Sequence, residues 1–289
     1  MRPISSVPAA VRWLLQPFMV LTLMLGLAVA RPAQSADQAE IDQLWTLLLM
    51  PEVLGIMHAE GIDYGESLDR DMLGGQGGDD WAAEVAAIYD IEWMTRTSRA
   101  AFGQALAGVD VSDGIAFFSS ELGARAVRLE YEARKAMLDP EADELARVRV
   151  QEMRDRALPW IDQLTRFAEV NDLFESNVAG ALNANYAFFK GLASGGALDP
   201  EMDDSAILAE VWAQEPGVRA DTIDWVYSFL NLAYQPLTDA ELDAYIAFSE
   251  TPGGQTLNRA IFSAFDGMFN DISFALGAGL ARRMVGEEL

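Results

Sequence analysis

The sequence contains no cysteine and a single histidine, His58, and these two shortages exclude several kinds of chemistry. Without cysteine the chain can form no disulfide and offers neither a thiol nucleophile nor a thiolate ligand. One histidine cannot build a histidine-rich metal site, and a Ser-His-Asp triad would need partners beside it. Glu60 and Asp63 follow it by two and five residues, so neither shares its helical face well. We therefore interpret His58 as a surface or half-buried residue, and we predict no metal and no cofactor.

Lysine is almost missing too, because Lys135 and Lys190 are the only two. The chain has 45 acidic residues against 20 basic ones, which gives a formal net charge of −25 at pH 7. A surface this acidic repels nucleic acid and anionic lipid headgroups, so neither is expected as a partner. The charge favours a cationic partner or serves only to solvate the protein, and solvation is the simpler interpretation.

Long hydrophobic runs are also lacking, except for one near the start of the chain. Arg2 and Arg12 flank the beginning of this segment, and residues 18–30 form a 13-residue apolar run that ends in Ala-Val-Ala. A membrane-spanning helix needs about 20 apolar residues, so this run is short for a span. The pattern is typical of a signal peptide over residues 1–30, which predicts a periplasmic or secreted bacterial protein. Cleavage after Ala36 and a retained anchor are the alternatives.

The rest of the sequence has helical periodicity and lacks the alternation that is typical of strands. Thr238 and Glu241 have the spacing of a capping box, which predicts a helix start at this point. Toward the C-terminus, apolar residues recur at spacings of three and four, as expected for a helix with one wide apolar face. They are Ile261, Phe265, Met268, Phe269, Ile272, Ala275, Leu276 and Leu280. The sequence therefore predicts an all-α fold, arranged as a helical bundle or a short solenoid.

Two stretches resemble each other without a gap at an offset of 131 residues. Residues 115–129 read IAFFSSELGARAVRL, and residues 246–260 read IAFSETPGGQTLNRA. Trp81 and Trp212 match at the same offset, and each half also carries a glycine pair. Such ordered matches predict two copies of one helical unit. The predicted units cover residues 38–137 and 160–285, and a charged helix at residues 138–159 connects them.

The repeated stretch is predicted to be a structural corner between two helices. Ser120 and Thr251 are interpreted as N-caps, and Pro252 takes the first helical position, where its missing N–H has no cost. Gly123 and Gly254 follow in the first helical turn, where glycine is intrinsically unfavourable by ~1 kcal/mol relative to alanine. We expect a neighbouring helix to pass too close to these glycines for a Cβ atom.

The second copy resembles a known family. Residues 241–255, ELDAYIAFSETPGGQ, fit the pattern Glu-Leu, five residues, Phe, two residues, Ser or Thr, Pro, any residue, Gly-Gln. This pattern is similar to the hallmark of domain-of-unknown-function family 2059. The family usually has Tyr after the Phe, where this chain has Ser249, and the first copy replaces Pro252 with Glu121. The resemblance implies an exported, all-helical bacterial protein without an assigned activity, and it implies no catalytic residues.

Five residues are candidates for a ligand or partner surface. Arg128 and Arg259 match across the two copies, so they could clamp an anion, although ion pairs with acids of neighbouring helices are the simpler explanation. Phe248, Phe265 and Phe269 could line an apolar groove between helices, or they could form core.

The leading functional hypothesis is a non-catalytic scaffold that binds a protein or cell-envelope partner. The alternative is a carrier of an apolar small molecule or lipid. A hydrolase that uses carboxylates or a cation is a third hypothesis, and it rests only on the abundance of acids. No catalytic residue is predicted, because no spacing rule selects a carboxylate pair from so many acids.

Overall fold

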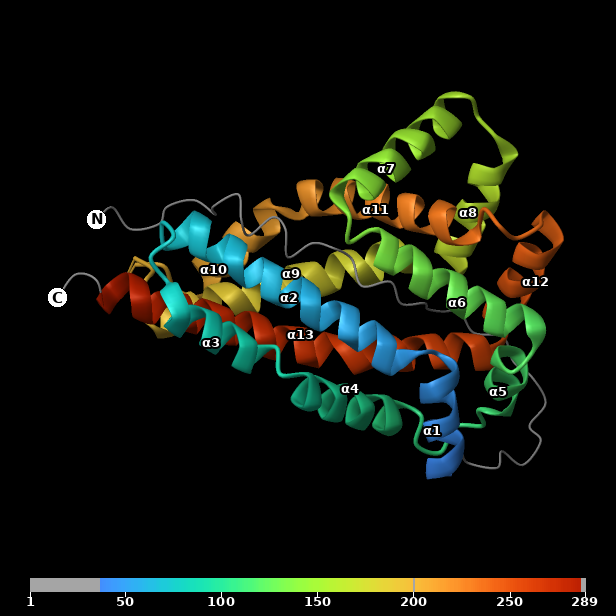
Figure 1. Ribbon diagram of the computed structural model, residues 1–289, viewed down its shortest axis with the longest axis horizontal. Coiled ribbons are helices and arrows are strands. Elements are labelled where there is room, and N and C mark those ends of the chain that lie inside the picture. The colour runs from blue at the N-terminus through green and yellow to red at the C-terminus, as the bar shows by residue number, and fades with distance from the viewer. Residues whose placement is uncertain (1–36, 200, 287–289) are drawn as a thin grey trace.

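The computed structural model describes residues 37–199 and 201–286, and these residues form helices joined by short connections (Figure 1). No strand occurs among them, so the predicted all-α class is confirmed. In chain order the helices are α1 (Gln38–Leu47), α2 (Met50–Met72), α3 (Gly78–Ile88), α4 (Ile91–Ala105), α5 (Ser112–Phe118), α6 (Glu121–Ala136), α7 (Pro140–Asp155), α8 (Pro159–Val170), α9 (Leu173–Ser194), α10 (Asp204–Ala213), α11 (Glu215–Tyr234), α12 (Asp239–Ser249) and α13 (Pro252–Gly286). The predicted signal peptide and its cleavage positions lie outside the described residues.

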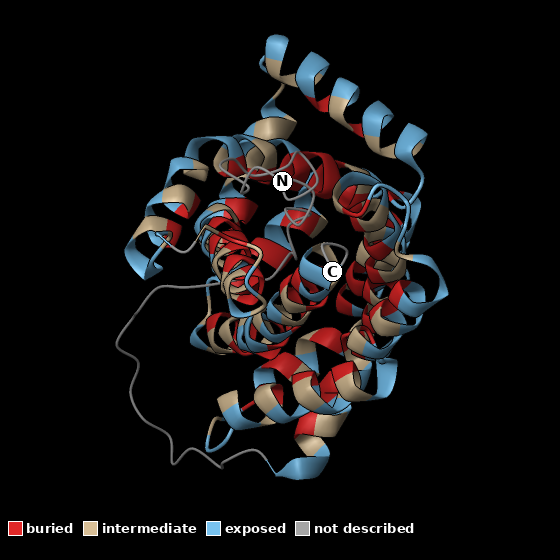
Figure 2. Ribbon diagram, turned by 90° about the vertical axis from the view of Figure 1, so that its left-hand side faces the viewer, coloured by how far each residue is buried: buried red, intermediate tan, exposed pale blue. Residues whose placement is uncertain are grey.

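The longest helix, α13, organises the bundle. It packs along α9 and α4 and also contacts α3, α5 and α12. The remaining long helices close a ring, because α4 contacts α2, α2 contacts α6, α6 contacts α11, and α11 contacts α9. Viewed along the bundle, the buried segments face the middle and the exposed segments face outward (Figure 2). The helix α7 packs on α11 at the outside of this ring.

Local sequence signals set many of the helix starts. Thr238 and Glu241 form the predicted capping box at the start of α12, and each group bonds the backbone N–H of the other. Asp37 and Glu40 form a second capping box before α1. The predicted start of α13 at Pro252 is confirmed as well.

One local feature recurs in the helices before and after α7. A residue with positive φ precedes the second helix on each side, Leu49 at 51° before α2 and Asp172 at 47° before α9. One predicted match does not hold, however. Trp81 lies near the start of α3 with 2% of its surface exposed, whereas Trp212 lies at the end of α10 and is 59% exposed. The tandem repeat therefore stays a prediction.

Glycines explain how closely α9 and α13 approach each other. A Cβ atom on Gly277 would lie 2.2 Å from the carbonyl oxygen of Phe188, and one on Gly191 would lie 2.2 Å from that of Phe274. Neither position has room for a side chain without a backbone shift. Glycine on both helices therefore permits their backbones to touch at this crossing.

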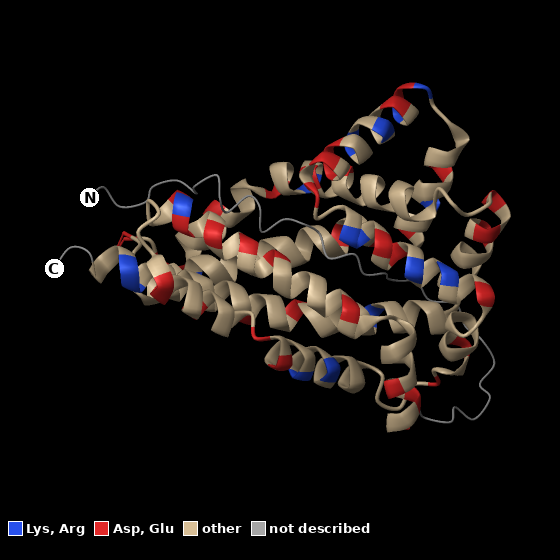
Figure 3. Ribbon diagram, viewed as in Figure 1, with Lys and Arg blue, Asp and Glu red and all other residues tan. Residues whose placement is uncertain are grey.

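Charge is unevenly distributed over the bundle. Acidic segments occur on most helices in the view of Figure 3, whereas basic segments show most clearly along α4, α6 and α7. Several of the bases are already paired with acids, among them Arg99 with Asp42 at 2.7 Å. Among the described helices, none has the length and apolarity that a membrane span requires.

Candidate functional site

The two corners have the same hydrogen-bonded geometry. The Ser120 hydroxyl donates to the carbonyl of Phe117 at 2.6 Å and accepts from the backbone N–H of Gly123 at 3.1 Å. The Thr251 hydroxyl donates to the carbonyl of Phe248 at 2.7 Å and accepts from the N–H of Gly254 at 3.0 Å. Each hydroxyl thus joins the end of one helix to the start of the next. Ser120 and Thr251 are N-caps, as the sequence predicts.

The reason for the corner glycines differs from the expectation. A Cβ atom on Gly123 would lie 2.1 Å from the carbonyl oxygen of Phe117, and one on Gly254 would lie 2.3 Å from that of Phe248. The obstructing backbone belongs to the helix that immediately precedes each corner, not to a separate helix that crosses it. The tightness of the corner itself therefore demands glycine.

The corners also contact each other. The rings of Phe117 and Phe248 are stacked with centroids 4.0 Å apart and planes 4° apart. Beside this stack, Arg125 on α6 pairs with Glu241 on α12 at 2.7 Å and donates to the carbonyl of Pro236 at 2.6 Å. Stacking and ion pairing together hold α5 and α6 against α12.

The two predicted arginines do not form a clamp. Arg259 donates to the hydroxyl of Thr256, one turn earlier on the same helix, at 2.8 Å. Arg128 is exposed. Neither guanidinium pairs with an acid among residues 37–199 and 201–286, so the expected ion pairs with neighbouring helices are wrong as well. The arginine that does connect helices in this region is Arg125.

The three predicted phenylalanines do not share one contact. Phe248 belongs to the aromatic stack between the corners. Phe265 is 4% exposed and packs beside Phe269 on α13, with ring centroids 6.3 Å apart. No ring contact joins Phe248 to this pair within the described part of the chain. The three side chains therefore act as packing residues in two separate places.

A half-buried acid, Glu130, is the centre of a polar cluster between helices. The carboxylate of Glu130 on α6 accepts hydrogen bonds from the hydroxyls of Tyr234 at 2.7 Å and Tyr245 at 3.1 Å. The two tyrosines come from α11 and α12, and Phe167 of α8 packs edge-on against both of their rings. This cluster therefore connects four helices.

The surroundings of Glu130 change its acidity. Burial raises the pKa of its carboxyl to about 7, although the two tyrosine hydrogen bonds act in the opposite direction. Burial also raises the pKa values of Tyr234 and Tyr245 well above their ordinary range, so both hydroxyls stay protonated as donors. The carboxyl can thus gain or lose a proton near neutral pH, while its partners cannot.

A partly buried ion pair lies between α2 and α6. Arg134 donates to Glu60 at 2.5 Å, and its guanidinium lies 5.3 Å from the centre of the Trp225 ring. Nearby on α2, the Nδ1 atom of His58 donates to the carbonyl of Tyr89 at 2.7 Å, which fixes the proton on that nitrogen. His58 therefore forms a hydrogen bond that joins α2 to the end of α3.

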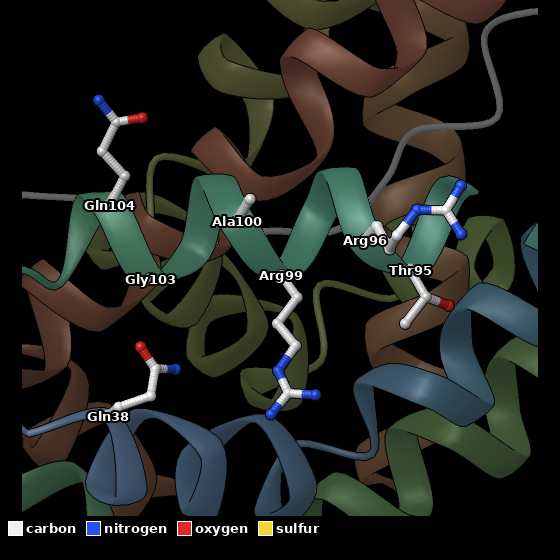
Figure 4. Close-up of a pocket in the computed structure, with 7 residues that line it drawn as sticks. All are labelled: Gln38, Thr95, Arg96, Arg99, Ala100, Gly103 and Gln104. Carbon is white, nitrogen blue, oxygen red and sulfur yellow. The ribbon is translucent and has the colours of Figure 1, made fainter. Parts of the chain in front are cut away.

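Surface hollows offer no better site. One hollow of about 420 Å³ lies between α1 and α4 (Figure 4). Arg99 and Gln38 point into the space between these helices, whereas Arg96 and Gln104 point away from α1. Arg99 is already neutralised by Asp42, and Arg96 lies 3.6 Å from Glu92, so neither cation awaits an anion. In the described residues no group of three or more acids or histidines could hold a metal ion.

The outward side of α10 is the most exposed apolar surface. Leu208 is 47% exposed and Trp212 is 59% exposed, and the two lie one turn apart on the same face. The adjacent face is formed by Ile207 and Val211, which are buried, and α10 packs on α9. We call this exposed apolar surface the α10 ridge, and it consists of Leu208, Ala209, Trp212 and Ala213 of α10 together with Pro216 of α11. Helical periodicity in the sequence predicts this helix. The match of Trp212 to Trp81, however, gave no indication that Trp212 is exposed.

A comparison with protein-family models, with curated proteins and with solved structures gives no match. The resemblance to domain-of-unknown-function family 2059 therefore stays a prediction that no family model supports. The functional argument rests on the residues of this chain alone.

Proposed function

We propose that this protein is a non-catalytic helical scaffold, exported to the periplasm or cell envelope, that binds a partner protein through the α10 ridge. One observation carries the proposal, namely the exposure of Trp212 and Leu208 on a helix whose other face is already buried. Contiguous exposed apolar surface rimmed by polar groups is typical of interaction sites.

The kind of residue in the ridge supports the same function. Tryptophan is enriched among the residues that dominate the binding energy of interfaces. Leu145 and Val148 on α7 are also exposed, at 49% and 44%, but neither is aromatic. The α10 ridge adds a tryptophan to its smaller apolar residues, and such residues are expected at the centre of an interface.

The alternative of an apolar ligand carrier has less support. Phe265 is packed in the core and Phe248 is stacked on Phe117, so neither ring is open to a ligand. The hollow between α1 and α4 is not lined by Phe248, Phe265 or Phe269.

The test is co-purification from the cells that naturally produce the protein. The wild-type chain should retain a partner, and Trp212→Glu should lose it while keeping the wild-type melting temperature. Leu145→Glu is the matched control, because it places the same charge on another exposed apolar position, and it should retain the partner. Equal retention by all three chains would overturn the proposal.

A further inference from the structure

We infer that the partner that covers the α10 ridge presents an amphipathic helix with arginine beside its apolar stripe. This inference rests on the proposed function and specifies the chemistry of its partner. It draws on the charges around the ridge and on a contact that the chain already makes within itself.

The residues around the ridge are acidic. Asp203, Asp204, Glu210 and Glu215 border it along the chain. Two of these acids have basic neighbours, since Lys190 pairs with Asp204 at 2.5 Å and Arg219 pairs with Glu215 at 2.6 Å. Glu210 forms no ion pair with any described residue. An apolar centre with an acidic border is complementary to an apolar segment with basic flanks.

The contact between α3 and α13 shows how such a surface receives a helix. The guanidinium of Arg283 lies 5.1 Å from the centre of the Trp81 ring, which is the range of a cation–π interaction. Arg282 and Arg283 both pair with Glu84, three residues after Trp81. A tryptophan and a glutamate one turn apart thus bind two arginines of an apolar helix.

The same two side chains recur at the α10 ridge with the same spacing. Residues 81–84 read WAAE, and residues 212–215 read WAQE. Gln214 between Trp212 and Glu215 has helical dihedral angles, with φ of −85° and ψ of −16°, so the turn continues from α10 into α11. Trp81 is buried under α13, whereas Trp212 is 59% exposed. Trp212 and Glu215 therefore repeat the residue types and spacing of the first pair, and no described helix covers Trp212, although Arg219 of α11 already pairs with Glu215.

A second copy of the chain fits this surface less well. The arginines that match the pattern, Arg282 and Arg283, are already paired with Glu84 of their own chain. A different protein can supply a helix whose arginines form no ion pair of their own. It can bind the ridge without breaking the contact between Glu84 and the two arginines.

The probe is a labelled synthetic helix of about 16 residues, or somewhat more than four turns. It has leucine at positions i, i+3, i+4 and i+7 and arginine on both sides of this stripe. A second peptide replaces each arginine by glutamine. Fluorescence anisotropy measures the binding of each peptide to the full chain. Size-exclusion chromatography measures the oligomeric state of the protein separately.

The arginine peptide should bind at least about tenfold more tightly than the glutamine peptide, and added salt should weaken it. Trp212→Ala and Glu215→Gln should each weaken binding by about tenfold, whereas Leu145→Ala should leave it unchanged. Equal binding of both peptides, or no effect of either ridge variant, would overturn the inference. Self-association through the ridge would overturn it too. The co-purification experiment can still succeed in these cases, so the two failures are distinguishable.

Discussion

Phe117 and Phe248 are stacked face to face, with ring centroids 4.0 Å apart and planes only 4° apart. Each phenylalanine lies three residues before the N-cap of the next helix, and its backbone carbonyl accepts a hydrogen bond from the hydroxyl of that cap. The rings thus join two corners that are far apart in the sequence. This contact connects the parts of the bundle before and after α7.

The stack predicts coupled stability effects. Phe117→Ala should destabilise the fold by ~2–3 kcal/mol because Phe117 is half-buried, and Phe248→Ala should cost ~3–4 kcal/mol because Phe248 is buried. The double variant should lose less than the sum by ~0.5–1.5 kcal/mol, because the second change removes a contact that is already gone. Urea unfolding of the four chains measures this coupling. Strict additivity would mean that the two rings do not support each other.

The corner glycines give a prediction with an adjacent control. Gly254→Ala should destabilise by ~1–3 kcal/mol, because the new Cβ would lie 2.3 Å from the carbonyl oxygen of Phe248. For Gly253→Ala the nearest atom to the new Cβ is in Asp113 at 3.4 Å, an ordinary contact, so this change should stabilise slightly through helix propensity. Thermal melts should therefore shift in opposite directions for these neighbours. A shift in the same direction for both would contradict the described corner geometry.

The caps predict a smaller effect. Thr251→Ala should cost ~1 kcal/mol, since the N–H of Gly254 then loses its acceptor. Thr251→Ser keeps the hydroxyl and should remain within a few tenths of the wild-type free energy of unfolding, on the order of 0.3 kcal/mol. Ser120→Ala should act like Thr251→Ala at the first corner. Chemical denaturation distinguishes these outcomes. If Thr251→Ala were as stable as the wild type, the hydroxyl of Thr251 would not act as a stabilising cap.

Glu130 predicts a pH dependence whose sign follows from its raised pKa. Its pKa rises from 4.5 in the unfolded chain to about 7 in the fold, so the folded state keeps a proton that the unfolded state releases. Its contribution to stability therefore falls as pH increases from about 4.5 to about 7, by at most ~3 kcal/mol. Glu130→Gln stays neutral and still accepts the tyrosine hydrogen bonds.

The measurement is the difference in melting temperature between Glu130→Gln and wild type across pH 4–8. This difference should become more favourable to the variant as pH rises through the window. Glu132→Gln, on the exposed side of the same helix, is the control and should show little change with pH. A constant difference between Glu130→Gln and wild type would contradict the raised pKa.

Local features of this protein could be predicted from sequence, and distant contacts could not. Two features depend only on residues within one helical turn, so the sequence patterns were enough to predict them. They are the capping box of Thr238 and Glu241 and the start of α13 at Pro252. Glu130 lies 104 and 115 residues from Tyr234 and Tyr245, and none of the three belongs to a recognisable motif. With so many acids in the chain, only the fold could select this one.

The errors have a similar cause. The glycines at the corners were correctly singled out, but sequence spacing cannot tell whether a carbonyl of the same corner or another helix blocks the Cβ. Trp81 and Trp212 share an offset with other matches, yet packing decides exposure. Trp81 donates to the carbonyl of Gly65 at 2.8 Å inside the bundle, whereas Trp212 faces outward.

Site-specific photocrosslinking at the α10 ridge tests the central claim most directly. A benzophenone side chain at position 212, in place of Trp212, should yield one heteromeric adduct in the cells that produce the protein. Mass spectrometry of that adduct should identify a crosslinked helical segment that carries arginine. As a control, the same benzophenone side chain at position 145, in place of Leu145, should give no such adduct. Failure to crosslink at position 212, or adducts formed only with further copies of this chain, would contradict the account.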